Sequence, residues 1–160
     1  MALNTSRRNF EYSMNQIMKS TVDGLDAAHM SDGLTGITTG LADLDDALGG
    51  FQKTDLIVIG GRPGMGKTAM MLNLADRCDV PCGIISAEQG HEQMGGRMIA
   101  INGKVSVHKM RRAKLDDEDW SNITMSVGRL ASRNTWINDK PSPSINEVIR
   151  QARKWKHQHD

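Results

Sequence analysis

The stretch DLIVIGGRPGMGKT, residues 55–68, decides the fold. Its first part, DLIVIG, is a short continuous apolar run, which is typical of a strand buried on both faces of a parallel sheet. The part that follows fits the pattern G-x-x-x-x-G-K-[ST] at every fixed position. Its residues are Gly61, Arg62, Pro63, Gly64, Met65, Gly66, Lys67 and Thr68. A strand, a glycine-rich loop and a helix in this order predict a phosphate-binding loop.

The residue types of this loop match the chemistry of a nucleoside triphosphate. Its glycines allow the backbone to wrap with its N–H groups inward, which forms an anion-binding nest at the positive end of the next helix. Lys67 can then reach the β- and γ-phosphates, and the Thr68 hydroxyl can bind Mg²⁺. A plain strand-to-helix turn is the alternative, but such a turn gives no reason for a Lys-Thr pair. The loop therefore predicts binding of ATP with Mg²⁺.

Strands and helices alternate after the loop, which predicts an α/β fold, a P-loop NTPase with a parallel sheet flanked by helices. The elements expected are a helix carrying Met70, Met71, Leu74 and Ala75, strands at 83–86 and 135–138, and helices at 91–101, from Asp116 and from Ser144. Asp116, and Ser144 with Glu147, have the spacing of N-terminal caps. The residues expected on the core face of the Asp116 helix are Trp120, Ile123, Val127 and Leu130.

A different pattern precedes the loop. An apolar stripe at helical spacing predicts a short amphipathic helix over residues 9–20. The members of this stripe are Phe10, Met14, Ile17 and Met18. Residues 21–36 mix Gly, Asp and Ser without a period and predict a linker. A second short helix is expected with Thr39 as its cap, Leu41, Leu44 and Leu48 on one face, and Gly49-Gly50 at its end. We therefore divide the chain into a linker with an amphipathic helix, residues 1–30, and a partial ATPase domain, residues 31–160.

The composition limits the classes of function. The chain has 160 residues, 38% of them hydrophobic, and its twenty Lys and Arg nearly balance nineteen Asp and Glu. This balance excludes histone-like proteins and acidic tails, so any contact with nucleic acid must come from a local cluster. The apolar runs are too short to cross a membrane and no signal peptide is visible, which predicts a cytoplasmic protein. Cys78 and Cys82 have neither a zinc spacing nor a disulfide framework and are expected to be plain thiols.

Two clusters of basic residues and histidines are candidates for weak, salt-sensitive DNA binding, with solvated surfaces as the alternative. The first consists of Lys104, His108, Lys109, Arg111, Arg112 and Lys114. The second consists of Arg150, Arg153, Lys154, Lys156, His157 and His159. The second cluster shares a helix with Trp155, which favours a solvated face around one buried tryptophan.

Hydrolysis requires a group that orients or deprotonates the attacking water, and Glu88 is the best placed candidate. It follows the predicted strand 83–86 at its carboxyl end, the edge at which open α/β sheets bind their ligands. Position alone leaves the alternative of a surface glutamate in a strand-to-helix loop. Asp139, directly after the predicted strand 135–138, is a further candidate for a metal-binding or supporting role.

These motifs together resemble the C-terminal motor domain of DnaB-type replicative DNA helicases, which are RecA-like ATPases. The likeness covers most of residues 30–158. It is carried by the TG, LD and GG positions of the lead-in, the RPGMGKT loop, Ser86-Ala87-Glu88, Glu92-Gln93 followed by Arg97, and KLDDEDW at 114–120. The wider group of RecA, RadA and KaiC-like ATPases shares the lead-in and is the alternative family.

The resemblance implies roles for individual residues. Lys67 and Thr68 fall on the phosphate and Mg²⁺ residues of the family, and Glu88 falls on its catalytic glutamate. Arg97 falls on an arginine near the bound nucleotide, with a solvated helix arginine as the alternative. Gln89 departs from the family, which usually has an apolar residue at this position.

The resemblance also implies partners, namely helicase subunits in a hexameric ring and single-stranded DNA. The helix over residues 9–20 corresponds to the linker helix that docks on a neighbouring subunit. The metal-binding aspartate, arginine finger and DNA-binding loops of the family would follow the helix that here ends in KWKHQHD, so we expect the first half of a motor domain. Two hypotheses follow: an ATP-hydrolysing helicase subunit or fragment, or a nucleotide-binding phage or prophage remnant that joins or inhibits a full ring.

Overall fold

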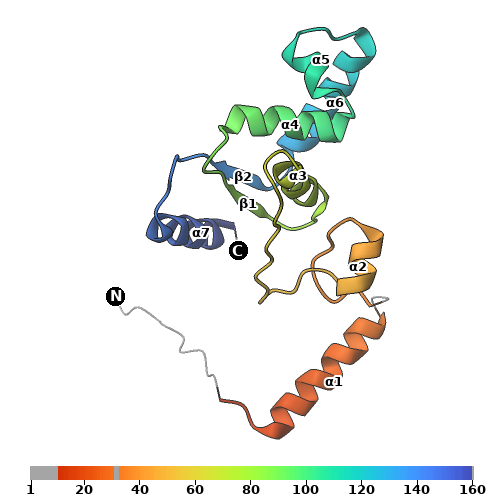
Figure 1. Ribbon diagram of the computed structural model, residues 1–160. Helices are drawn as coiled ribbons and strands as arrows, with labels where there is room; N and C mark the ends of the chain where they lie inside the picture. The colour runs from red at the N-terminus through yellow and green to blue at the C-terminus, as the bar shows by residue number, and fades with distance from the viewer. Residues whose placement is uncertain (1–10, 31–32, 160) are drawn as a thin grey trace. The chain divides into compact units, whose positions relative to one another are not determined.

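The computed structural model describes residues 11–30 and 33–159, and the chain divides into two compact units, Met1–Thr54 and Asp55–Asp160 (Figure 1). The first unit contains helices α1 (Met14–Met30) and α2 (Ala42–Leu48). The second unit contains α3 (Lys67–Arg77), β1 (Cys82–Ile85), α4 (His91–Gly103), α5 (Val107–Arg111), α6 (Asp117–Ala131), β2 (Thr135–Asn138) and α7 (Ile145–His159).

Helix α1 begins later and ends later than the helix predicted over residues 9–20, since residues 11–13 are not helical and the prediction of a linker at residues 21–30 is wrong. A reciprocal cap starts the helix. The backbone N–H of Gln16 donates to Ser13 Oγ (3.3 Å), and the backbone N–H of Ser13 donates to Gln16 Oε1 (2.8 Å). Alanines at 27 and 28 favour helix near its end. The apolar side chains of α1 lie exposed, including Ile17 and Val22. Phe10, part of the predicted stripe, lies outside the described residues.

Helix α2 ends as predicted, at Gly49, which adopts a left-handed conformation with φ 66°. Its N-terminus differs from the prediction, because Leu41 and not Thr39 occupies the cap position. Thr39 is fully buried and its backbone N–H donates to Asp45 Oδ1 (2.7 Å), while the Thr38 hydroxyl donates to Asp45 Oδ2 (2.6 Å). These two bonds lower the pKa of the Asp45 carboxyl. A side chain inside the helix therefore orders the loop before it.

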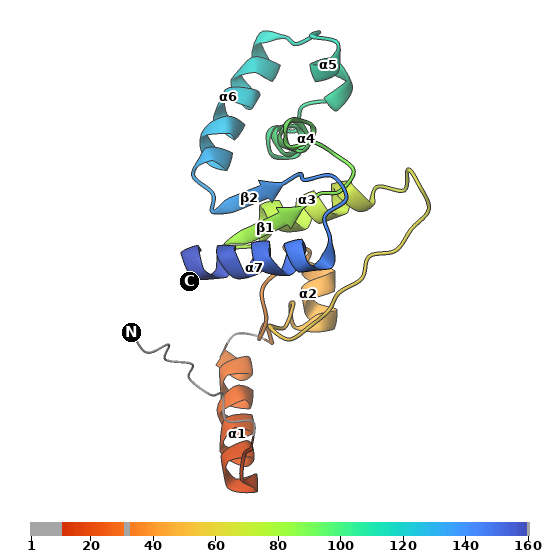
Figure 2. The same cartoon turned by 90° about the vertical axis from the view of Figure 1, so that its left-hand side faces the viewer.

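The two strands of the second unit form a parallel sheet, in which Cys82 pairs with Thr135 and Ile85 with Asn138. Successive side chains of β1 point to opposite faces. Ile84 packs with Leu72 and Met94 in a core between β1, α3 and α4, whereas Gly83 faces Trp155 of α7. Helix α7 lies on the opposite side of the strands from α4 in both views (Figures 1 and 2). The predicted α/β architecture with helices on both sides of the sheet is confirmed.

The predicted strand at residues 55–60 does not form. Leu56 is 90% exposed and Val58 is 82% exposed, and the run pairs with no strand in the described part of the chain. The reason is that strand formation needs a neighbour that accepts and donates backbone hydrogen bonds. Neither β1 nor β2, the two paired strands of the described residues, offers this neighbour to the run. The apolar composition of 55–60 thus indicates a strand-forming tendency without fixing the partner.

Helix α6 begins as predicted, with a capping box in which Asp116 accepts from the Asp119 N–H (2.8 Å) and Asp119 accepts from the Asp116 N–H (3.3 Å). Its predicted core face is partly wrong, because Trp120 is 57% exposed and Val127 is 46% exposed. Ser126 is buried instead, with its Oγ 2.6 Å from where a Cβ would lie on Gly103 of α4. The absent side chain at Gly103 lets the helices approach closely and turns this small polar residue inward.

Helix α7 begins with the predicted capping box between Ser144 and Glu147. Lys140 also binds the Glu147 carboxylate, and these bonds lower the pKa of Glu147 to about 2. Trp155 is half-buried against β1, and the ring of His159 stacks on Trp136 with centroids 3.6 Å apart. The cationic residues of the helix are exposed around Trp155.

Candidate nucleotide-binding site

The phosphate loop has the backbone geometry that its glycines predict. Gly64 and Gly66 adopt φ values of 80° and 88°, a left-handed region that favours glycine. Gly66 is the N-cap of α3, so the helix begins at Lys67 and Thr68 occupies its first turn. The free N–H groups and positive dipole end of a helix N-terminus attract anions. The loop and the first turn of α3 therefore have the backbone geometry expected of a phosphate-binding element.

Lys67 lies along the loop that precedes it. Its Nζ donates to the carbonyl oxygen of Gly61 (3.0 Å) and to that of Arg62 (3.2 Å). A further bond, from the Met65 N–H to the Arg62 carbonyl (3.2 Å), closes the turn. Lys67 is exposed, so the ammonium group can leave these carbonyls for a phosphate.

A cavity of about 370 Å³ lies over the loop, within the size range of small-molecule sites. Its lining residues are Pro63, Gly64, Gly66, Lys67, Thr68, Ala69, Glu88, Gln89 and Arg97. Three separate segments, the phosphate loop with the start of α3, the β1–α4 loop, and α4, thus bring together the residues predicted for phosphate, Mg²⁺ and water. Gly61, Arg62 and Met65 of the predicted site do not line the cavity, and Met65 is 73% exposed.

Sequence reasoning missed Ala69 and Gln89 as lining residues. Ala69 carries no chemical signal, whereas Gln89 was marked only by its departure from the family pattern. Gln89 Oε1 and Arg97 Nε are both buried and have no hydrogen-bond partner among the described residues. Buried polar atoms are nearly always hydrogen-bonded, by protein or by ordered water. An acceptor and a donor that need partners therefore belong to residues that line the same cavity.

The residues present fit Mg²⁺ bound through nucleotide phosphates rather than a metal ion held by the protein alone. No group of three or more His, Cys, Asp or Glu residues lies close enough to hold a metal ion within 11–30 and 33–159. Thr68, the residue predicted to bind Mg²⁺, lines the cavity and supplies the one hydroxyl among its lining side chains. This is the pattern expected for Mg²⁺, which keeps waters and binds substrate phosphates with few protein ligands.

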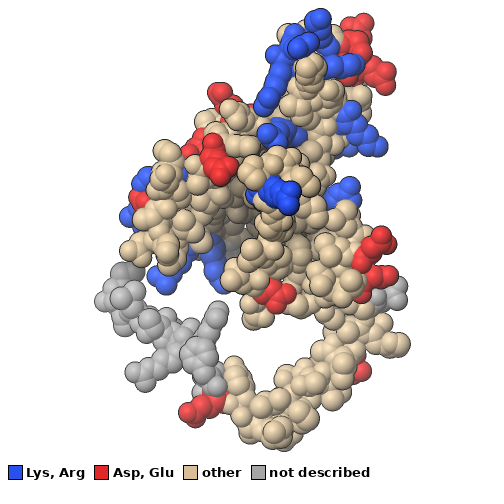
Figure 3. Space-filling model, viewed as in Figure 1, with Lys and Arg blue, Asp and Glu red and all other residues tan. Residues whose placement is uncertain are grey.

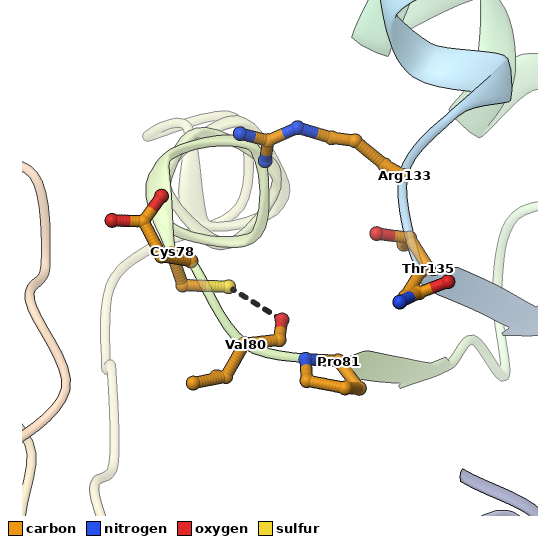
Figure 4. Close-up of a pocket in the computed structure, with 7 residues that line it drawn as sticks. Cys78, Val80, Pro81, Arg133 and Thr135 are labelled. Atoms are coloured by element: carbon orange, nitrogen blue, oxygen red, sulfur yellow. Dashed lines mark hydrogen bonds between the residues drawn. The ribbon is translucent and has the colours of Figure 1, made fainter.

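A second cavity, of about 210 Å³, lies at the other end of the strands, where β1 and β2 begin (Figure 4). Cys78, Val80, Pro81, Arg133 and Thr135 are among its lining residues. Burial and the neighbouring Cys78 raise the pKa of the Cys82 thiol to about 11, so it stays protonated at neutral pH. Both cysteines are free. Cys82 therefore offers no thiolate nucleophile at this end of the sheet.

Comparisons with known proteins identify the family. The model of the DnaB-like helicase C terminal domain matches residues 36–160. The chain belongs to this family. The replicative helicase DnaC of Bacillus subtilis is 34% identical over 149 residues, which cover 90% of this chain and 33% of that protein. The replicative helicase DnaB of Geobacillus stearothermophilus is also 34% identical over 149 residues, with the same coverage. The chain therefore spans about a third of the length of these relatives.

Solved structures of the DnaB-like family share the fold. The ATPase domain of G40P matches with a TM-score of 0.85 and 27% identity, over 94% of this chain and 54% of that one. A DnaB-like replicative helicase, studied with its interactions with primase, matches with a TM-score of 0.78 and 27% identity, over 94% and 36%. The predicted RecA-like fold and the predicted family are thus confirmed.

The surface over α5 and the start of α6 is mixed in charge. Lys and Arg gather over α5 at the top of the molecule, beside acidic residues of α6 (Figure 3). Lys109 of the first basic cluster binds Asp116 (3.1 Å) and Asp119 (2.7 Å). DNA binding by this cluster remains a prediction. Among the described helices, none combines the length and apolar character needed to span a bilayer.

Proposed function

We propose that this chain binds ATP with Mg²⁺ and hydrolyses the γ-phosphate as part of a replicative DNA helicase. The observation that carries the proposal is the cavity that gathers Lys67, Thr68, Glu88 and Arg97 in a chain of the DnaB-like family. In this proposal Lys67 binds the phosphates and Thr68 binds Mg²⁺. Glu88 orients the attacking water, and Arg97 contacts the nucleotide. Such a division of roles is what phosphoryl transfer requires, because catalysis there consists of positioning and electrostatic stabilisation.

Each group has a specific task in this proposal. The N–H groups of the loop and of the first turn of α3 bind the β- and γ-phosphates, and Lys67 exchanges its two carbonyl partners for phosphate oxygens. Thr68 holds Mg²⁺, which when bound neutralises charge on the phosphates. The Glu88 carboxylate orients the attacking water and accepts its proton. Arg97 donates to the nucleotide through its guanidinium group, which lines the cavity.

We further propose that the whole protein acts in a ring of helicase subunits on single-stranded DNA, as the family membership suggests. A second candidate function is a nucleotide-binding chain that joins or inhibits a helicase ring. The exposed apolar side chains of α1 favour it, since they suit a surface covered by another polypeptide. Co-elution with a full-length DnaB-type helicase, together with a lower unwinding rate, distinguishes this second function from autonomous hydrolysis.

The test of hydrolysis compares the unaltered chain with Glu88→Gln. Phosphate release should fall at least about a hundred-fold in the variant, a loss in the range of a general base, while calorimetry should show unchanged MgATP affinity. Glu118→Gln, an exposed acidic residue on α6, is the matched control and should leave both quantities unchanged. Equal phosphate release by Glu88→Gln and the unaltered chain would show that Glu88 is not the base.

A further inference from the structure

An acidic side chain that does not line the cavity is joined to the segment that carries Glu88. Asp139 directly follows β2, and its Oδ2 accepts from the backbone N–H of His91 (2.9 Å) and contacts His91 Nδ1 (2.7 Å). The two residues are 48 positions apart in the sequence. The link therefore joins the carboxyl end of β2 to the start of α4.

Asp139 takes the place of a missing N-terminal cap. The cap position of α4 is Gly90, which has no side chain to accept a hydrogen bond from the first turn. His91 is the first residue of the helix, so its N–H is one of the donors that a helix leaves unpaired. The Asp139 carboxylate accepts from this N–H and places a negative charge at the positive end of the helix. His91 adds the imidazole, whose pKa is raised by Asp139.

The link between Asp139 and His91 is the second of two attachments of loop 86–90, which carries Glu88. The first attachment is at Ser86, whose N–H donates to the Asn138 carbonyl (2.8 Å). The Ser86 hydroxyl then accepts from the Gln89 N–H (3.1 Å) and donates to the Gln89 carbonyl (2.7 Å). One end of the loop is thus attached to Asn138 in β2, and the other end is attached to Asp139 directly after β2. The bonds between Ser86 and Gln89 hold the loop to itself. The Glu88 side chain, exposed between them, forms no hydrogen bond or ion pair with the described part of the protein.

We propose that Asp139 and His91 are positioning residues that fix loop 86–90 and so hold Glu88 over the phosphate loop. The inference rests on the proposed function, since it requires Glu88 to be the base. Small displacements of a catalytic group reduce turnover steeply, by about a hundred-fold for 1 Å. An exposed ion pair, by contrast, contributes little to global stability. Loss of the link should therefore affect turnover much more than folding.

The experiment measures steady-state ATP hydrolysis by the full chain. Asp139→Ala should lower kcat about ten-fold with less than a two-fold change in KM for MgATP. Asp139→Asn should recover kcat to within about three-fold of the unaltered chain, because the amide oxygen still accepts from the His91 N–H. His91→Ala keeps that N–H and should lose less than Asp139→Ala. Asp117→Ala, an exposed aspartate in the first turn of α6, is the control.

Two further measurements separate this inference from the proposed function. In a Glu88→Gln background, Asp139→Ala should cause no additional loss of kcat, because a positioning residue acts through the group it positions. An equal ten-fold loss in that background would overturn the inference. A normal kcat for Asp139→Ala would also overturn the inference. If Glu88→Gln is inactive in the same assay, the proposed function still stands.

If the unaltered chain shows no turnover, the proposed hydrolysis fails and amide hydrogen exchange decides the link. Exchange over residues 87–91 should be at least ten-fold faster in Asp139→Ala than in the unaltered chain, with exchange in α6 unchanged. Equal exchange over 87–91 in the two proteins would overturn the inference. Melting temperatures of the variants should match that of the unaltered chain, which excludes global unfolding as the cause.

Discussion

The indole ring of Trp155 lies directly on the backbone of Gly83, so that a Cβ on this glycine would be 2.4 Å from ring carbon Cε3. Glycine at this position of β1 thus lets α7 approach the sheet. Gly83→Ala should reduce the free energy of unfolding by about 1–3 kcal/mol, because the ring must move away or the strand must shift. Urea denaturation followed by tryptophan fluorescence measures this change. Gly128→Ala on α6 is the control for the added methyl group, which there meets nothing within 4 Å, and it should not lose stability because alanine favours helix over glycine.

Removal of the Lys67 ammonium should weaken nucleotide binding. Charge-assisted hydrogen bonds contribute about 1.5–3 kcal/mol each, so Lys67→Ala should raise the Kd for MgATP by roughly 10- to 150-fold. Isothermal titration calorimetry gives this value. Lys154→Ala, an exposed lysine on α7, should bind normally. An unchanged Kd for Lys67→Ala would refute the phosphate-binding assignment of the loop.

The buried Oε1 of Gln89, which has no hydrogen-bond partner among the described residues, should lower the free energy of unfolding in the absence of nucleotide. Gln89→Met has a similar shape and removes the buried Oε1, so we expect the free energy of unfolding to rise by about 1 kcal/mol. With saturating MgATP this gain should shrink if the Gln89 amide contacts the bound nucleotide or its water. Paired denaturation curves with and without MgATP test this. A gain of equal size in both conditions would place Gln89 outside the nucleotide contacts.

The charge on Glu147 should make part of the stability pH-dependent. Its pKa is about 2 in the folded protein, lowered from 4.5 by Lys140 and by the Ser144 backbone and hydroxyl. A carboxyl with a depressed folded pKa stabilises above its unfolded pKa, and this stabilisation is lost as the pH falls from 4.5 toward 2. Glu147→Gln retains the capping-box spacing but not the charge. The variant should therefore be less stable than the unaltered chain at pH 7, and the difference, measured by urea midpoints, should shrink as the pH falls toward 2 and vanish below it.

Local chemistry explains which elements the sequence could predict. The caps at Asp116 and Ser144 act within three residues, so their spacing alone placed the starts of α6 and α7. The glycine positions of the phosphate loop are likewise local, because they depend on backbone dihedral angles. Glu88 could be placed at the ligand-binding edge of the sheet because it follows β1 at the carboxyl end of that strand. These features need no knowledge of distant contacts.

The wrong or missed features depend on contacts between distant residues. The run at 55–60 has strand composition, but a strand also needs a partner, which composition does not name. The buried face of α6 is set by Gly103 on another helix, so helical spacing around Trp120 and Val127 could not reveal it. The bond between His91 and Asp139 spans 48 residues. The Ser13–Gln16 cap, however, is local and could have been read from the sequence.

The helical character of residues 21–30 changes what the N-terminal segment can transmit. A flexible tether of this length would let its two ends vary in separation, whereas 17 residues of continuous helix form a rod about 25 Å long. A rod conveys displacement and rotation along its axis instead of absorbing them. Gly24 is the single glycine within α1, so Gly24→Ala should make this rod stiffer still, because alanine favours helix over glycine.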